Sequence, residues 1–274
     1  MLGAYHNIKL YFFLLLLILF GCGTPKPLII SENLSSNSQK FKVKLGTQWM
    51  GKTHKISFGD YAVVESKSGW EKTKSSSNFF GTKSESETSH KFSLKLMNKT
   101  NGMAAWVRAT KEINIKATHE IEFLTINNRD YDIHFTAGED ELLLNSLDFA
   151  AFITIEKDTT EIWSLFMIEK FDVEEGSDYY AVLTNGEEKF LIYHITSDEE
   201  WTYFDNFPIP PASGYEFYYD QESVAAFQYY GGGTMGQNDC IVWLGNNLDE
   251  KTELILAAGI TAMLEITVNK YIYD

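Results

Sequence analysis

Cysteine and proline are scarce in this chain, which has two cysteines and five prolines in 274 residues. No Cys-x-x-Cys or His-Glu-x-x-His spacing occurs, so the sequence carries no strong zinc signature. The Asp-rich calcium loop, the Gly-x-Ser-x-Gly nucleophile elbow and the Lys-Ser/Thr of a phosphate loop are also missing. These absences predict no metal and no cofactor. They leave open whether the protein is an enzyme.

Positive charge is also scarce, and it is unevenly placed. The chain has 23 Lys and Arg against 38 Asp and Glu, a net charge of -15. Cys22–Lys111 has 15 basic and 6 acidic residues, a net +9, whereas Glu112–Asp274 has 7 against 32, a net -25. The acidic majority would repel a phosphate backbone, which argues against nucleic acid as a ligand. Lys40, Lys42 and Lys44 could lie against anionic headgroups, or they could form part of a solvated lysine-rich surface.

The N-terminus has the order of a secretory signal. Residues 1–10 carry one cation, Lys9, and Tyr11–Phe20 is an unbroken apolar run of ten. A bilayer span needs about twenty apolar residues, so the run is too short for a transmembrane helix. It ends in Leu19-Phe20-Gly21-Cys22, which resembles the bacterial lipobox. An ordinary secretory peptide with an unrelated cysteine is the alternative.

The lipobox resemblance implies that residues 1–21 are removed and that Cys22 receives a diacylglyceryl group and a further acyl chain such as palmitate. Each buried methylene contributes about 0.8 kcal/mol, so several chains on one residue anchor a protein stably. Gly23 stands where an aspartate would resemble an inner-membrane retention signal, which favours the outer membrane. We therefore expect a lipid-anchored protein of the bacterial cell envelope, on a membrane face that the sequence leaves open.

The rest of the chain divides into a connection and one domain. Residues 22–40 contain Pro25, Pro27 and a Ser- and Asn-rich stretch, which predicts a lipidated, flexible tether. From Phe41 onward, apolar and polar residues alternate in short runs, the period of strands with one wet face. Residues 41–274 are therefore expected to form a single β-rich domain with about a dozen strands.

One segment departs from the strand pattern, Leu248–Ile266. Asp249 suits a helix N-cap, and acidic residues follow it in the first turn. From Leu254 to Leu264 almost every residue is apolar, so a helix here has no polar face and has to be enclosed on all sides. The alternative is a pair of buried strands broken at Gly259.

The same segment resembles the end of the phospholipid scramblase domain and of its tubby and LURP-one relatives. Asn247-Leu-Asp-Glu-Lys251 precedes Leu254-Ile-Leu-Ala-Ala-Gly259, as a Leu-Asp-x-Lys-like stretch precedes an apolar helix in that superfamily. The resemblance implies a mainly β fold, a closed antiparallel barrel of about twelve strands around a buried helix near 249–266. A β-sandwich with a packed C-terminal helix is the alternative. The chain as a whole resembles uncharacterised bacterial lipoproteins.

One expected hairpin is polar on both faces. Its arms, Gly69–Ser77 and Thr82–Ser89, consist almost wholly of Ser, Thr, Lys and Glu, and Asn78-Phe-Phe-Gly81 joins them. A pair of phenylalanines at the tip of such a ribbon could touch a membrane or a partner, or it could fold back onto the barrel.

The anchor, the charge distribution and the missing catalytic motifs favour a non-enzymatic envelope module that contacts lipid headgroups or a protein partner. Its candidate contact residues are Lys40, Lys42, Lys44, Phe79 and Phe80. An envelope-polymer hydrolase is an alternative if His134 and His194 converge with neighbouring carboxylates. A glycan-binding surface lipoprotein is another, because aromatic residues make up 15% of the chain. The substrate, the partner and the oligomeric state do not follow from the sequence.

Overall fold

The computed structural model of this chain describes residues 27–46, 51–77, 83–118, 121–127, 132–137, 141–156, 158–172, 176–197, 202–204, 207–209, 211–233 and 238–272. The predicted signal peptide, 1–21, lies outside these residues, and so do three of the predicted site residues: Cys22, Phe79 and Phe80.

Most of the described chain is strand, in one antiparallel sheet of 14 strands and two small hairpins. The strands of the large sheet are β1 (Ser38–Lys42), β2 (Lys44–Leu45), β3 (Ile56–Phe58), β4 (Tyr61–Ser68), β5 (Lys72–Ser77), β6 (Lys83–Asn98), β7 (Ala104–Thr118), β10 (Glu141–Ile155), β11 (Asp158–Asp172), β12 (Gly176–Thr184), β13 (Lys189–Thr196), β16 (Ser213–Tyr219), β17 (Glu222–Tyr230) and β18 (Ile241–Gly245). The hairpins are β8 (Ile121–Asn127) with β9 (Asp132–Ala137), and β14 (Thr202–Phe204) with β15 (Phe207–Ile209). The described helices are α2 (Glu32–Ser36) and α3 (Glu250–Ile272).

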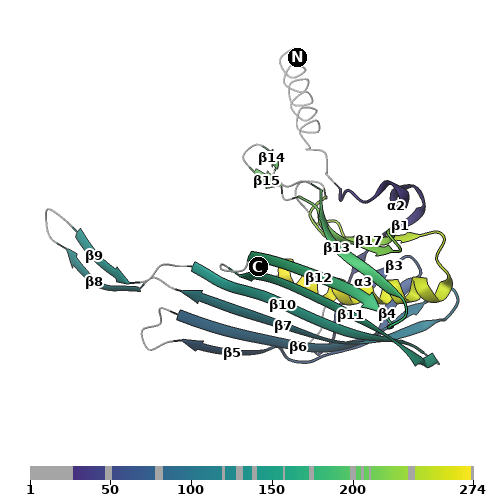
Figure 1. Ribbon diagram of the computed structural model, residues 1–274, viewed down its shortest axis with the longest axis horizontal. Helices are drawn as coiled ribbons and strands as arrows, with labels where there is room; N and C mark the ends of the chain where they lie inside the picture. Colours follow the sequence, from purple (N-terminus) through teal and green to yellow (C-terminus); the bar gives the residue numbers. More distant parts are fainter. Residues whose placement is uncertain are drawn as a thin grey trace, which may run out of the picture.

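The large sheet wraps around α3 as a nearly closed barrel (Figure 1). Its path runs β1-β18-β17-β16-β13-β12-β11-β10-β7-β6-β4-β3-β2. β1 and β2 follow each other in the chain, and between them the Val43 N–H donates to the Cys240 carbonyl over 2.9 Å. One stretch of chain therefore pairs with β18 on one side and with β3 on the other. The predicted barrel is confirmed, and the sandwich alternative is wrong because the sheet does not split into two layers.

The 14 strands form twelve continuous staves, a stave being one run of chain along the barrel wall. β1 and β2 lie end to end around Val43 and count as one. β4 and β5 also count as one, because both pair with β6, one after the other. The two mergers take the 14 strands to twelve staves, in line with the barrel of about twelve strands that the superfamily resemblance implied. Closure at the seam pairs both ends of the sheet path, whereas β5 and the first part of β12 each pair on one side only among the described residues.

The helix α3 fills the middle of the barrel. Every residue from Leu254 to Thr267 is buried, so the predicted enclosure on all sides is confirmed. The helix starts where the Asp249 carboxylate accepts the N–H groups of Lys251 (3.0 Å) and Thr252 (3.1 Å). It continues past the predicted end at Ile266 to Ile272, and the alternative of two strands is wrong. Within the described chain, we find no helix whose length and apolar character would let it cross a bilayer.

Small residues let the helix approach the wall. A Cβ built on Gly259 would lie 3.5 Å from Leu183, 3.8 Å from Ile153 and 3.9 Å from Leu165, all of them inward residues of neighbouring staves. Outward residues on the same staves alternate with these, as the period of a strand requires. The core is therefore a layer of wall side chains packed directly on α3.

Several staves continue past the C-terminal end of α3 as an extension (Figure 1). β5 is exposed along its whole length and pairs with the first half of β6, from Lys72 opposite Ser89 to Ser77 opposite Ser84. The two polar arms predicted from the sequence are therefore confirmed. The β8–β9 hairpin lies at the far tip of the extension (Figure 1).

Candidate functional site

The segment from Pro27 to Asn37, which we call the strap, crosses the outside of β16, β17 and β18 and includes α2. Leu28 and Leu34 are buried there against Ala212, Ala226 and Trp243, in a hydrophobic cluster separate from the barrel core. The prediction of a flexible tether over residues 22–40 is therefore wrong from Pro27 onward. The Ser- and Asn-rich composition concealed two leucines for which the outer wall supplies a packing surface.

A buried carboxylate, Glu216 on β16, holds the middle of the strap. Its Oε1 accepts hydrogen bonds from the Ser31 N–H (3.0 Å), the Ser31 hydroxyl and the Ser223 hydroxyl (2.5 Å). Its Oε2 accepts from the Tyr218 hydroxyl over 2.9 Å. Burial raises the pKa of Tyr218, and the hydrogen bond to Glu216 raises it further. A buried charge is costly unless it is fully hydrogen-bonded, so this arrangement depends on a docked strap.

A second buried side chain, Gln228 on β17, holds the start of the strap. Its Oε1 accepts the Leu28 N–H over 2.9 Å, and its Nε2 donates to the carbonyls of Gly231 (2.9 Å) and Asp239 (2.7 Å). Sequence reasoning missed Glu216 and Gln228. In the sequence, each of these two residues is a polar residue within an apolar strand. Any strand with one solvent-exposed face shows the same pattern, so it does not single them out.

The predicted lysines form a row on the stave that closes the barrel. Lys40, Lys42 and Lys44 are exposed, whereas the alternate residues Phe41 and Val43 pack toward the core. The Lys40 ammonium lies 5.3 Å from the centroid of the Trp243 ring, and the Lys42 ammonium lies 2.9 Å from the Asp239 carboxylate. The structure thus brings the three lysines together as a lysine row, in which two members already have partners.

The mouth of the barrel at the start of α3 holds a cavity of about 310 Å³ between the strap and the wall. Asn33, Leu34 and Asn37 of the strap line one side, and Phe190 and Tyr219 line the other. The Tyr219 hydroxyl donates to Glu188 over 3.4 Å. The nearby Glu188 carboxylate is the largest cause of the raised pKa of Tyr219. One side of this cavity exists only while the strap is docked.

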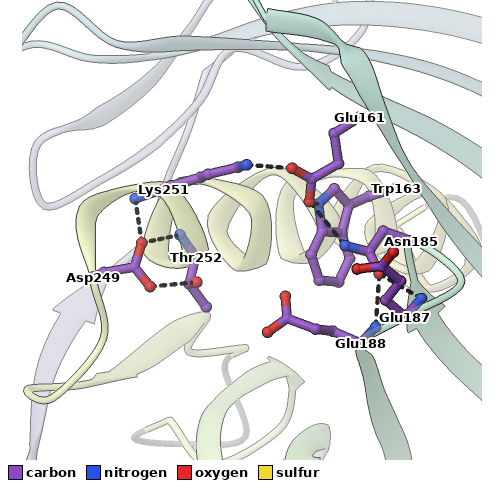
Figure 2. A network of polar contacts seen from close by, with 8 residues as sticks. All are labelled: Glu161, Trp163, Asn185, Glu187, Glu188, Asp249, Lys251 and Thr252. Carbon is purple, nitrogen blue, oxygen red and sulfur yellow. Dashed lines mark hydrogen bonds and ion pairs between the residues drawn. The ribbon is translucent and has the colours of Figure 1, made fainter.

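A polar network fixes α3 to the same mouth, as Figure 2 shows. The Glu161 carboxylate pairs with the Lys251 ammonium and accepts hydrogen bonds from the Trp163 indole (2.7 Å) and the Asn185 amide (2.9 Å). The Lys251 contact, followed by that from Asn185, lowers the pKa of Glu161. The Asp249 carboxylate caps the helix, and its hydrogen bonds with Thr252 lower its pKa. These contacts join α3 to β11 and to the β12–β13 turn or cap the helix, which indicates a structural role.

At the other end of α3 a buried pair joins the helix to the loop before β3. The Glu265 carboxylate accepts the His54 N–H over 3.0 Å and lies 3.1 Å from His54 Nδ1. Both side chains are buried. The contact ties residues that are 211 positions apart in the chain.

The two histidines named for a hydrolase lie on separate sheets. His134 is on β9, in the hairpin at the tip of the extension, and His194 is on β13 of the barrel (Figure 1). The Nε2 of His194 lies 3.4 Å from the Tyr229 hydroxyl, and its ring packs 5.2 Å from the centroid of Tyr215. Among the described residues, no group of three or more His, Cys, Asp and Glu could hold a metal ion.

Comparison with known proteins gives no relative. No family model, no curated protein and no solved structure matches this chain. The case for a function therefore rests on the residues and contacts described above.

Proposed function

We propose that the protein is a lipid-anchored, non-enzymatic binding module of the bacterial cell envelope, with the outer membrane favoured. It sits against its membrane and contacts lipid headgroups through the lysine row. Membership of the tubby, scramblase and LURP-one superfamily is part of the proposal, supported by the twelve-stave barrel around an apolar helix.

The docked strap is the observation that carries this proposal. Leu28 is fixed on the barrel, and Cys22 precedes it by only six residues. An extended chain spans at most about 3.6 Å per residue, so six residues reach roughly 20 Å. An acyl group on Cys22 would therefore hold the barrel close to the bilayer.

The lysine row lies at the same place on the barrel as the start of the strap. Gln228 bonds both the Leu28 N–H and the Asp239 carbonyl, and the Asp239 carboxylate pairs with Lys42. Anionic headgroups attract a nearby Lys with about 1 kcal/mol, and the attraction falls off within a Debye length of about 8–10 Å. The anchor reaches roughly 20 Å, so it lets Lys42 and its neighbours approach the headgroups to within this distance.

Two experiments test the proposal on the full chain expressed in a bacterium. Mass spectrometry of the N-terminal peptide should find a diacylglyceryl group and an amide-linked acyl chain on Cys22. An unmodified Cys22 would refute the anchor. Lysine acetylation of protein in vesicles should then show Lys40, Lys42 and Lys44 protected by anionic lipid, and this protection should disappear in high salt.

Lys99 serves as the internal control, because it is an exposed lysine in the turn between β6 and β7. Its labelling should be the same in neutral and anionic vesicles. Equal labelling of the lysine row in both kinds of vesicle would refute headgroup contact. The hydrolase alternative gains no support, because His134 and His194 lie on separate sheets.

A further inference from the structure

The outside of the barrel carries large apolar side chains where solvated strands normally carry polar ones. They lie on β10, β11 and β12, and each is 39–52% exposed. We call them the apolar wall: Phe152, Ile162, Phe166, Ile168 and Tyr180. Exposed apolar patches rimmed by polar residues mark interaction surfaces in soluble domains.

Strand register places parts of the apolar wall side by side, with the exposed Asp148 of β10 opposite Ile168 at its edge. Ile168 lies opposite Tyr180, and Phe166 lies opposite Val182, across the β11–β12 pair. Along β11 the outward positions from Ile162 to Ile168 are Ile, Ser, Phe and Ile, with no charged residue among them.

A basic groove of about 660 Å³ adjoins the apolar wall. Its cations are Lys67 on β4, Lys91 on β6 and Arg108 on β7, and its lining includes Phe152 but no Asp or Glu. Register places Lys67 opposite Ser93, Ser93 opposite Arg108, and Arg108 opposite Phe152. The groove and the wall therefore form one surface that is cationic on one side and apolar on the other.

None of these three cations forms an ion pair within the described part of the chain. In a protein with a net charge of -15, cations without carboxylate partners favour an anionic ligand. Trp70, which follows Gly69 of the groove lining, is 81% exposed. Tryptophan is enriched where a protein meets the interface of a bilayer.

We propose that the basic groove and the apolar wall together bind the surface of an anionic phospholipid bilayer. Lipid phosphates contact Lys67, Lys91 and Arg108, and the apolar wall, with Phe152 nearest, enters the interfacial layer. A free phosphate would use the cations but not the wall, and a neutral apolar partner would use the wall but not the cations. An anionic amphiphile uses both.

The groove end of this surface, on β6 and β7, faces away from the strap, and the apolar wall lies between the two, three to five strands from β17. From β17, under the strap, six staves lead to β7 in either direction around the ring of twelve. Figure 1 shows the strap helix α2 above the barrel and β6 and β7 below it. If the chain is anchored through Cys22, the basic groove and the adjoining Phe152 are presented to a second membrane surface. Only the orientation toward a second membrane rests on the proposed function, because binding of the groove and the apolar wall to a bilayer does not require the anchor.

A vesicle-capture assay tests the inference. Acylated protein is placed in neutral phosphatidylcholine vesicles, and fluorescent acceptor vesicles are added, either neutral or rich in phosphatidylglycerol. The anionic acceptors should be captured, and high salt should weaken the capture. Each cation near an anionic surface contributes about fivefold, so K67Q/K91Q/R108Q should lower capture by about a hundredfold. Phe166→Ser should also lower it, with an unchanged near-ultraviolet circular dichroism spectrum.

The control variant is K40S/K42S/K44S, which should leave acceptor capture unchanged. If this variant loses capture while the groove variant keeps it, the lysine row is the contact and the inference is overturned. Equal capture of neutral and anionic acceptors would also overturn it. If anionic vesicles are not captured even at low salt, the inference is also overturned. An acidic protein would then be the ligand that the basic groove and the apolar wall fit. If the protein does not insert into the neutral vesicles, the proposed lipid anchor is wrong. In that case, flotation of the protein with anionic vesicles alone tests whether the basic groove and the apolar wall bind a bilayer.

Discussion

Cys240 is a buried thiol between two strands of the barrel. Burial raises its pKa to about 11, and the nearby Asp239 adds to the effect. Its Sγ donates to the Tyr229 carbonyl over 3.4 Å. Because the thiolate is the reactive form, native protein at pH 8 should show almost no reaction with a thiol reagent. After unfolding, one equivalent should react, because an acylated Cys22 has no thiol. A second equivalent would contradict acylation, and fast reaction in the native state would contradict burial.

Glu161 ties the stability of the fold to pH. Its pKa lies below the ordinary 4.5 in the folded state, chiefly because of Lys251. Its contribution to the free energy of unfolding is therefore fully present above pH 4.5. The contribution is lost as pH falls through the lowered pKa. We expect Glu161→Gln to reduce the free energy of unfolding at pH 7 by at most about 1 kcal/mol, as for other partly exposed ion pairs.

Denaturant titrations of this variant and the parent at several pH values measure the difference, which should shrink below pH 4.5. Glu187→Gln is the matched control, because Glu187 lies in the turn that holds Asn185, a partner of Glu161, and its side chain is exposed. A pH-independent loss in Glu161→Gln would mean that its packing, not its charge, stabilises the fold.

At the scale of elements, Gly259 sets how α3 packs on the wall. A Cβ at this position would make ordinary contacts of 3.5–3.9 Å with Leu183, Ile153 and Leu165. Gly259→Ala should therefore raise the free energy of unfolding by about 0.5–1 kcal/mol, because alanine favours helix more than glycine does. Gly259→Leu should lower it by about 1–3 kcal/mol, because the wall leaves no room for a longer side chain. Chemical denaturation checks both, and a stabilising Gly259→Leu would mean that the helix lies farther from the wall.

The strap should open without the barrel. Leu34 is buried against the outer wall, and Leu34→Ser removes most of its apolar contact, a change that costs about 2–5 kcal/mol for a buried leucine. Hydrogen exchange should rise at least tenfold in residues 28–37 and stay unchanged in α3. Ser35→Ala, at an exposed position of the same helix, is the control. Equal loss of protection in α3 would show that strap and barrel unfold together.

At the scale of the whole molecule, the barrel depends on a seam of few residues. β1 and β2 join the two ends of the sheet, and the Val43 N–H continues the ladder between them. Val43→Pro removes that donor and should cost about 1–3 kcal/mol. Hydrogen exchange should then rise in β1, β2, β3 and β18. Val43→Ala keeps the N–H and should preserve protection along the seam. Similar hydrogen exchange in Val43→Pro and Val43→Ala would mean that packing of the valine side chain, and not its N–H, protects the seam.

The sequence by itself determined the elements whose signals are local. Asp249 and the apolar run after it predicted a helix enclosed on all sides, because a helix without a polar face cannot meet water. The alternation that starts at Phe41 predicted strands, since one face of each must be wet. The prediction ended the helix at Ile266, six residues too early, because the polar residues that follow weaken the local helix pattern. The helix continues to Ile272.

The tertiary structure alone decided what depends on which strands are neighbours. Lys67, Lys91, Arg108 and Phe152 are scattered along the chain, and only register places them in one surface. The strap was misjudged for the same reason, because Leu28 and Leu34 are buried by residues about 200 positions away. Local composition fixes which residues prefer burial. Whether a burial site exists is set by pairing between distant strands, which no local pattern specifies.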